Sequence, residues 1–207
     1  MSAPLPQQPI GIKMTNAPTP SVVVEMFHDV CCPFSNTMFS TIYNPVISEL
    51  KERAVIHKIE FLFHCVPQPW HSQSCCMNEA VMAAAILDGS KAVSYINGIF
   101  AEQTTFFDDN TGDLSRNELY DKLSDIAVIS GYDHEKFRSL LSLEGVTGNE
   151  GLGDVTQYLK WAVKYHRARA VHVTPTVFVN GLEAPDISSG WSAEEWITKL
   201  HPMLKSI

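Results

Sequence analysis

The chain has 207 residues, of which 45% are hydrophobic and 18% are charged, and its formal net charge is −8. A chain of this length buries roughly 70% of the surface that it exposes when unfolded, so it can form a core without a metal or a disulfide. The acidic balance argues against a nucleic-acid binder. No apolar run approaches the ~18 residues of a membrane span.

The five cysteines indicate a reducing compartment. Their number is odd and they are spread along a long chain, which is not the pattern of a disulfide framework. The N-terminal segment also lacks the apolar stretch of a secretory signal. We therefore expect a cytoplasmic location, unless a leader has been removed.

The first part of the chain is expected to contain an arm, two strands and a helix. Residues 1–20 hold five prolines and little apolar periodicity, which predicts a proline-rich arm that is mobile or lies on the surface. Residues 22–27 are typical of a buried strand, and residues 55–63 predict a second one. Between them, Pro33 suits the first turn of a helix, and Asn44-Pro45 predicts a kink in that helix.

The middle of the chain is predicted to be helical. Residues 65–74 are rich in Pro, His, Gln and Ser, which indicates a loop, and residues 77–168 show helical apolar spacing almost throughout. A capping box at 115–118 marks one helix start in this block. A block of about 85–90 residues is too long for a connecting loop. We therefore expect an all-helical subdomain inserted into a sheet domain.

The last part of the chain predicts a strand, a turn and a helix. Residues 176–179 read as a third strand, and Asn180-Gly181 after it favours a hairpin. A capping box at 192–195 opens a terminal helix that runs to about residue 205. With the first strand–helix–strand unit paired in parallel by a right-handed crossover, the predicted fold class is α/β.

The chemistry is expected at Cys31-Cys32-Pro33-Phe34-Ser35. Cys32 would follow a strand and begin a helix, where unpaired backbone N–H groups and the helix dipole favour a thiolate. Ser35 lies one turn further on, close enough for its hydroxyl to hydrogen-bond that thiolate. The alternative is a buried, inert cysteine that packs like a small hydrophobic residue.

A second element is Val173-Thr174-Pro175-Thr176, where a proline directly precedes the third strand. A cis bond between Thr174 and Pro175 would leave the backbone of Thr174 free to pair with an extended, sulfur-bearing ligand. The alternative is an ordinary trans proline at the start of a strand.

In this order and topology, the two elements resemble the thioredoxin superfamily, and most closely its DsbA-like branch, over residues 21–205. The resemblance implies a thioredoxin fold with an inserted all-helical subdomain. The thioredoxin-like domain would comprise residues 21–64 and 166–207, and the inserted subdomain residues 65–165.

The resemblance also implies roles for individual residues. Cys32 takes the position of the nucleophile, Pro175 that of the facing cis-proline, and Ser35 that of the second cysteine in the C-P-x-C string; these three are the expected catalytic residues. Pro33, Phe34 and Thr174 are the expected substrate-binding residues.

Ser35 departs from the branch, because a protein that passes disulfides through an internal dithiol needs a second thiolate to resolve the mixed disulfide. Three functions therefore stay open. Cys32 could act as a monothiol with glutathione or a protein thiol. The fold could serve glutathione-dependent transfer or isomerisation, as in kappa-class glutathione transferases and 2-hydroxychromene-2-carboxylate isomerases, which usually have serine at the nucleophile position. The chain could also be a redox-inactive binding module or chaperone.

The expected partners are protein or small-molecule thiols and disulfides, with glutathione as a candidate co-substrate and no cofactor.

Other cysteines and charged residues near Cys32 leave further alternatives. Cys31 or the Cys75-Cys76 pair could resolve a mixed disulfide on Cys32, although packing at a helix start is favoured for the pair. The stretch 64–76 is rich in His and Cys but lacks zinc-site spacing, so no metal site is expected. Asp29 either tunes the site or is a simple loop carboxylate. The basic residues at 165–169 are a solvated helix end or a glutathione contact.

Overall fold

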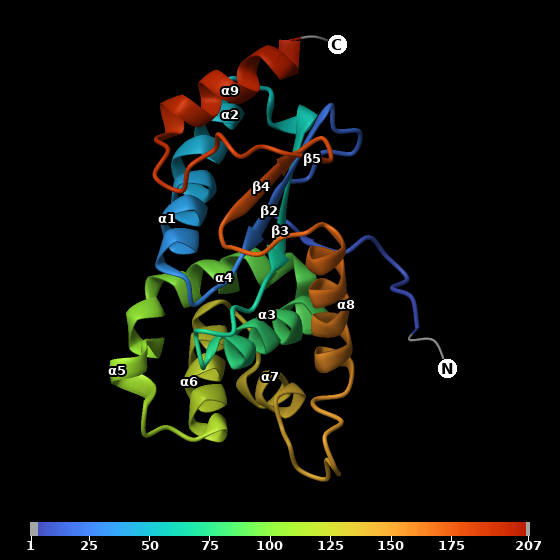
Figure 1. The fold of residues 1–207 in the computed structure, drawn as a ribbon, viewed down its shortest axis with the longest axis vertical. Coiled ribbons are helices and arrows are strands. Elements are labelled where there is room, and N and C mark those ends of the chain that lie inside the picture. Colours follow the sequence, from blue (N-terminus) through green and yellow to red (C-terminus); the bar gives the residue numbers. More distant parts are fainter. Residues whose placement is uncertain (1–3, 206–207) are drawn as a thin grey trace.

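A five-stranded mixed sheet occupies the upper half of the molecule in Figure 1, with strand order β1-β3-β2-β4-β5. The computed structural model describes residues 4–205, and residues 1–3 and 206–207 lie outside this description. The strands are β1 (Ile12–Lys13), β2 (Val22–His28), β3 (Ile59–Cys65), β4 (Thr176–Val179) and β5 (Leu182–Glu183).

Helices surround the sheet and form the lower half of the molecule. The α-helices are α1 (Pro33–Thr41), α2 (Ile47–Glu52), α3 (Ser74–Asp88), α4 (Ala92–Ala101), α5 (Asp108–Thr111), α6 (Arg116–Ile129), α7 (His134–Leu140), α8 (Asp154–Ala168) and α9 (Ala193–Lys205). A π-helical turn (Ile42–Val46) joins α1 to α2, and short 3₁₀ turns cover Ile56–Lys58, Gly89–Lys91 and Gln103–Phe106. The expected kink is therefore a π turn around Pro45, whose missing N–H removes one bond of the α-helical ladder.

The strands meet in the arrangement that the sequence predicted for one mixed sheet. Strands β2 and β3 are parallel, with Val22 opposite Ile59 and His28 opposite Cys65. Strand β4 runs antiparallel to β2 and continues through the Asn180-Gly181 turn into β5. The predicted α/β thioredoxin fold with a helical insertion is confirmed.

The second strand begins later than the sequence predicted, at Ile59 and not at residue 55. Helix α2 ends at Glu52, and Ala54 then takes a left-handed conformation with φ 54°. Lys58 N–H donates to the Val55 carbonyl in the 3₁₀ turn that follows. The chain uses these residues to reverse direction before it can join the sheet.

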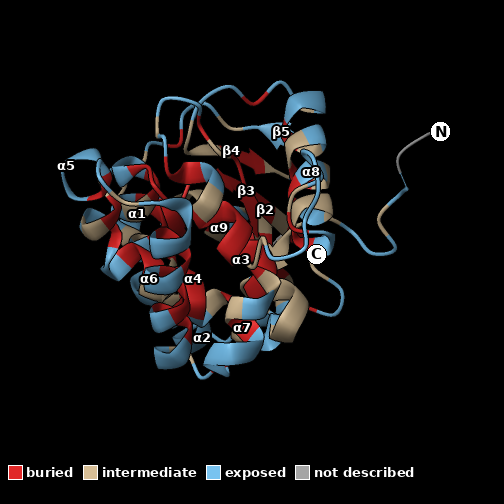
Figure 2. Ribbon diagram, turned by 90° about the horizontal axis from the view of Figure 1, so that it is seen from below, coloured by how far each residue is buried: buried red, intermediate tan, exposed pale blue. Residues whose placement is uncertain are grey.

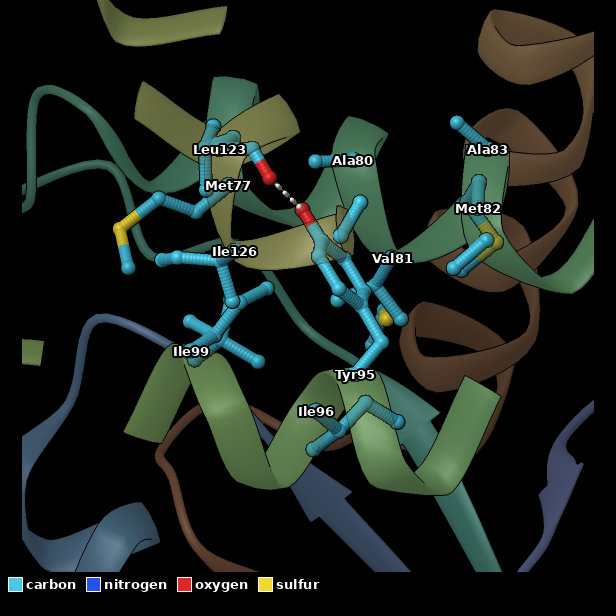
Figure 3. Close-up of a cluster of buried hydrophobic side chains, with 14 of the residues drawn as sticks. Met77, Ala80, Val81, Met82, Ala83, Tyr95, Ile96, Ile99, Leu123 and Ile126 are labelled. Carbon is cyan, nitrogen blue, oxygen red and sulfur yellow. Dashed lines mark hydrogen bonds between the residues drawn. The ribbon is translucent and has the colours of Figure 1, made fainter. Parts of the chain in front are cut away.

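The two larger of the hydrophobic clusters found in residues 4–205 position the sheet. One lies between the sheet and the helices α1, α2 and α9, around the fully buried Met26, Phe61 and Trp196. The other fills the helical block. Figure 3 shows its centre, where Tyr95 packs among side chains of α3 and α6 and its hydroxyl donates to the Leu123 carbonyl at 3.0 Å.

Two elements cross the ends of the predicted insertion, residues 65 and 165. Strand β3 includes Cys65, and α8 is continuous through Ala168, so its last turns pack on the sheet. Tyr165 of α8 contacts Phe27 of β2 in a stacked arrangement, with ring centroids 6.0 Å apart. Helix α8 therefore belongs to both parts of the fold.

Part of the N-terminal segment is built into the fold, whereas the sequence predicted an arm that is mobile or lies on the surface. Ile12–Lys13 pairs with β3 as an edge strand, and Ala17 is buried. Further out, the indole N–H of Trp161 on α8 donates to the Pro4 carbonyl at 2.7 Å. Figure 2 shows the exposed outer part of this segment leading away from the buried centre. None of the helices described in the structure is long and apolar enough to cross a membrane.

Candidate active site

Cys32 lies at the junction between β2 and α1. It is the N-cap residue of α1, in extended conformation, and Pro33 is the first helical residue. The backbone N–H of Cys32 donates to the Asp29 carbonyl at 2.9 Å, which closes the turn that leads out of β2. At this end of α1 the helix dipole is positive, and the N–H groups of the first turn have no intrahelical partners.

Thr174 and Pro175 lie beside Cys32. The peptide bond between them is cis, the conformation considered from the sequence. Since β4 pairs with β2 and places Thr176 opposite Phe27, the residues just before β4 reach the start of α1. The Sγ atom of Cys32 is 3.5 Å from the Thr174 carbonyl oxygen, to which the thiol donates.

Ser35 is fully buried and does not take the hydrogen bond that its spacing suggested. Its hydroxyl oxygen accepts from the backbone N–H of Asp29 at 3.2 Å, and no hydrogen bond to Cys32 occurs in the described chain. Helix α1 turns Ser35 under the loop that carries Cys32, so the hydroxyl ties the helix to the end of β2.

Asp29 is a buried hydrogen-bond acceptor and not a simple loop carboxylate. Its side chain is fully excluded from solvent. The Asp29 network consists of five donors: the N–H groups of Cys31 (3.1 Å) and Gln68 (3.3 Å), the Ser74 hydroxyl (2.6 Å), the Asn78 amide (3.2 Å) and Nδ1 of His71 (2.7 Å). One carboxylate thus joins the Cys32 loop to the loop after β3 and to the start of α3.

Comparison with known proteins identifies the fold. No protein-family model matches the sequence, and no curated protein matches it. Solved structures do. A proposed protein-disulfide isomerase from Pseudomonas syringae has 22% identity and a TM-score of 0.71, over 92% of this chain and 97% of that chain. BdbD from Bacillus subtilis has 16% identity and a TM-score of 0.72, over 95% of this chain and 94% of that chain. DsbA from Mycobacterium tuberculosis has 17% identity and a TM-score of 0.64, over 95% and 93%.

The chain has a DsbA-like thioredoxin fold. Cys32 lies at the start of the first helix of this fold, and the cis bond between Thr174 and Pro175 comes directly before β4, the strand that pairs with β2.

Gln103, in the helical insertion of this DsbA-like fold, forms hydrogen bonds to the loop that carries Cys32. Its side-chain amide is buried and donates to the carbonyls of Val30 at 2.9 Å and Cys32 at 3.0 Å. Its carbonyl oxygen accepts from the Asn36 amide at 3.2 Å. The sequence analysis did not find this residue, because a lone glutamine about seventy residues from Cys32 carries no pattern.

Four of the five cysteines have thiol pKa values above the ordinary value. Burial raises the pKa of the Cys31 thiol to about 12. The Cys75 side chain is exposed on one side, but partial desolvation and the nearby Glu79 raise the pKa of its thiol to about 11. Burial also raises the pKa of Cys65 and Cys76. These four thiols therefore stay protonated at neutral pH, and none of them forms a disulfide.

Large apolar side chains are exposed on the segments around Cys32. Phe34 in the first turn of α1 is 63% exposed, and Val173, next to Thr174, is 60% exposed. Trp70 is 60% exposed and precedes His71, a member of the Asp29 network. Of these three residues only Phe34 was a predicted binding residue. Trp70 could have been singled out from the sequence, because a tryptophan is unusual in a loop rich in proline and histidine.

The basic residues at 165–169 do not act together. Tyr165 and Arg169 turn toward the sheet and bind the buried Glu25, at 2.5 Å from the tyrosine hydroxyl and 3.0 Å from the guanidinium. Burial opposes the charge of Glu25, but the neighbouring His64, Tyr165 and Arg169 lower its pKa to about 2. Within residues 4–205, no group of three or more His, Cys, Asp or Glu side chains is arranged to hold a metal ion.

Proposed function

We propose that the protein is a thiol-disulfide oxidoreductase that uses Cys32 as a monothiol nucleophile. The observation that carries the proposal is the position of the Cys32 sulfur, at the N-terminus of α1 and 3.5 Å from the Thr174 carbonyl beside a cis-proline. The DsbA-like fold of structures named as thiol-disulfide exchange proteins adds support. The expected partners are protein or small-molecule thiols and disulfides.

The exchange runs through one mixed disulfide. The Cys32 thiolate attacks one sulfur of a disulfide RS–SR′, forms Cys32–S–SR and releases R′S⁻, which takes up a proton. Because Ser35 offers no second thiol, an external thiolate R″S⁻ then attacks the R sulfur, forming RS–SR″ and releasing the Cys32 thiolate. Glutathione is our candidate for the external thiol, in a cytoplasmic setting where it is abundant and reduced.

Residues around Cys32 serve this reaction in four ways. N–H groups of the first turn of α1 stabilise the thiolate. The Thr174 backbone pairs with the chain of an extended substrate once the thiol has lost its proton. Pro33 and the exposed ring of Phe34 follow Cys32 in the chain and contact the substrate there. Gln103 and Asp29 position the loop.

Oxidised glutathione tests the proposal directly. We expect intact-mass analysis at pH 7 to show one glutathionyl adduct, and peptide mapping to place it on Cys32. Removal of the adduct by reduced glutathione should be complete, since Ser35 offers no second thiol that would compete for the mixed disulfide. Cys32→Ser should abolish the adduct, whereas the matched control Cys75→Ser, which removes an exposed thiol, should keep it. An adduct on Cys75 with none on Cys32 would refute the proposal.

A second candidate function is a redox-inactive binding module. The exposed Phe34, Trp70 and Val173 favour it, because exposed apolar side chains on the segments that adjoin Cys32, Thr174 and the Asp29 network also suit an unfolded polypeptide. This function predicts that Cys32→Ser leaves suppression of client aggregation unchanged. The glutathione transferase or isomerase function gains no such support, since a cysteine stands where those proteins usually have serine.

A further inference from the structure

A groove of about 530 Å³ lies between the start of α3 and one face of α8. We call it the α3–α8 groove. Figure 1 shows α3 and α8 side by side at the edge of the helical half. Its floor is apolar, formed by Pro67, Leu159 and Val163, and its α8 wall is basic.

The basic wall consists of Lys160, Lys164 and Arg167. The spacing of four and three residues puts all three on one face of α8. All three are exposed, and none forms an ion pair or side-chain hydrogen bond with any residue in the range 4–205. The net charge of the chain is −8, so three adjacent cations without carboxylate partners form a positive patch on a protein that is acidic as a whole.

The α3 side of the groove adds to the positive potential. Cys75 lies in the first turn of α3, which contains no acidic residue and has no side-chain cap. Backbone N–H groups in such a turn lack intrahelical partners, and the helix dipole is positive there. The one carboxylate in the groove, Glu79, is neutralised by Arg116, whose guanidinium nitrogen lies 2.9 Å away.

The groove is connected to the loop of Cys32. Pro67 precedes Gln68, and Cys75 follows Ser74; both Gln68 and Ser74 donate to Asp29. The same carboxylate accepts from the N–H of Cys31. The rim of the groove is therefore one residue away from the network that holds the nucleophile loop.

We propose that the α3–α8 groove binds an acidic, extended segment of a polypeptide substrate whose cysteine reacts with Cys32. This inference rests on the proposed function and names its substrate class. From residue 160 to residue 167, α8 rises about 10 Å, which is the length of about three residues of extended chain. The basic wall thus matches carboxylates spread along a peptide, and the apolar floor matches the side chains between them.

Binding of a cysteine-free peptide tests the groove separately from the thiol chemistry. The probe is a fluorescein-labelled peptide that alternates Glu with Leu, compared by anisotropy with the same peptide carrying Gln for Glu. In the parent protein, we expect the acidic peptide to bind more tightly than the neutral one, with an affinity that falls as salt is raised. Equal affinity for the two peptides would overturn the proposal.

Charge reversal locates the site. Lys160→Glu with Lys164→Glu should weaken binding of the acidic peptide by about tenfold or more, because two attractive charges become repulsive. The matched control Lys122→Glu with Lys136→Glu reverses two exposed charges on α6 and α7 and should change the affinity less than about twofold. All four side chains are exposed, and thermal melts will show that each variant is folded. An equal loss in both variants would refute the assignment to the groove.

Two further arms separate the remaining outcomes. S-methylglutathione, an acidic tripeptide that cannot exchange thiols, should compete poorly. Competition as strong as that of the acidic peptide would replace the polypeptide with a small ligand and overturn the proposal. The binding assay is repeated with Cys32→Ser: unchanged binding supports the groove even if Cys32 accepts no glutathione, so the groove and the proposed function can fail separately.

Discussion

Replacing Ser35 by cysteine would place a second thiol one helical turn from Cys32 and so test the geometry of the site. The Ser35 hydroxyl is fully buried and accepts from the Asp29 N–H at 3.2 Å. Sulfur accepts a hydrogen bond more weakly than oxygen, which leaves this buried N–H poorly satisfied. With the larger atom also to be packed, we expect the reduced variant to lose about 1–3 kcal/mol of unfolding free energy.

The new thiol pair should oxidise to an intramolecular disulfide. Its reduction potential should fall within roughly −270 to −120 mV, the spread of thioredoxin-like proteins, because the same helix N-terminus stabilises the reduced thiolate. The variant should then oxidise a reduced peptide without added glutathione, whereas the parent should require it.

Redox titration followed by intact mass gives the potential, and peptide oxidation gives the turnover. Ser35→Ala is the matched control, since it removes the same acceptor without adding a thiol and should lose stability without gaining activity. If mild oxidant produces no disulfide between Cys32 and the introduced cysteine, the register of the C-P-F-S string on α1 is misassigned and the reasoning fails.

Three other residues give predictions of their own. Asp29→Asn should lower the unfolding free energy by about 2–4 kcal/mol in urea titrations, because an amide cannot accept from all five donors; an unchanged midpoint would contradict this. Gln103→Leu should slow alkylation of Cys32 severalfold relative to Cys75 in the same sample, and equal slowing of both would point to a general effect. Burial, with a further contribution from His64, lowers the pKa of His28 from 6.5 to about 3. Below pH 6.5 the unfolded state binds a proton at His28 and the folded state does not. The unfolding free energy should therefore fall by about 1.4 kcal/mol per pH unit below about pH 6. In His28→Phe this slope should be smaller.

The sequence was sufficient for β2 and for the β4–β5 hairpin, because these strands carry local signals, whereas β1 lies in the segment that was predicted as an arm. Residues 22–27 form a β-branched run, and the Asn180-Gly181 turn predicted the hairpin that links β4 to β5. The approach of Cys32 to Thr174 was implied by the resemblance to the DsbA-like branch. In the structure it depends on the pairing of β2 with β4, which brings together residues that are 142 positions apart.

The residues that position the Cys32 loop carry no comparable sequence pattern. The role of Asp29 depends on donors from the loop after β3 and from α3, and that of Gln103 on a 3₁₀ turn packed beneath the Cys32 loop. Ser35 was assigned a partner by helical spacing alone, but spacing does not tell which of two nearby groups a hydroxyl meets. Such contacts are set by tertiary packing, which single-residue patterns do not encode.

The N-terminal strand has a consequence for how these molecules behave at high concentration. A sheet edge with free N–H and C=O groups is a template on which a second molecule can add a strand. Here β1 covers β3 on one side, and the two-residue β5 is all that the other side presents. Removing the first fourteen residues would uncover the backbone edge of β3, where Ile12 and Lys13 pair with Phe63 and Leu62 and the N–H of Met14 donates to the Phe61 carbonyl at 2.8 Å. The proline-rich segment thereby protects the sheet against self-association, and a truncated chain would be prone to oligomerise through that edge.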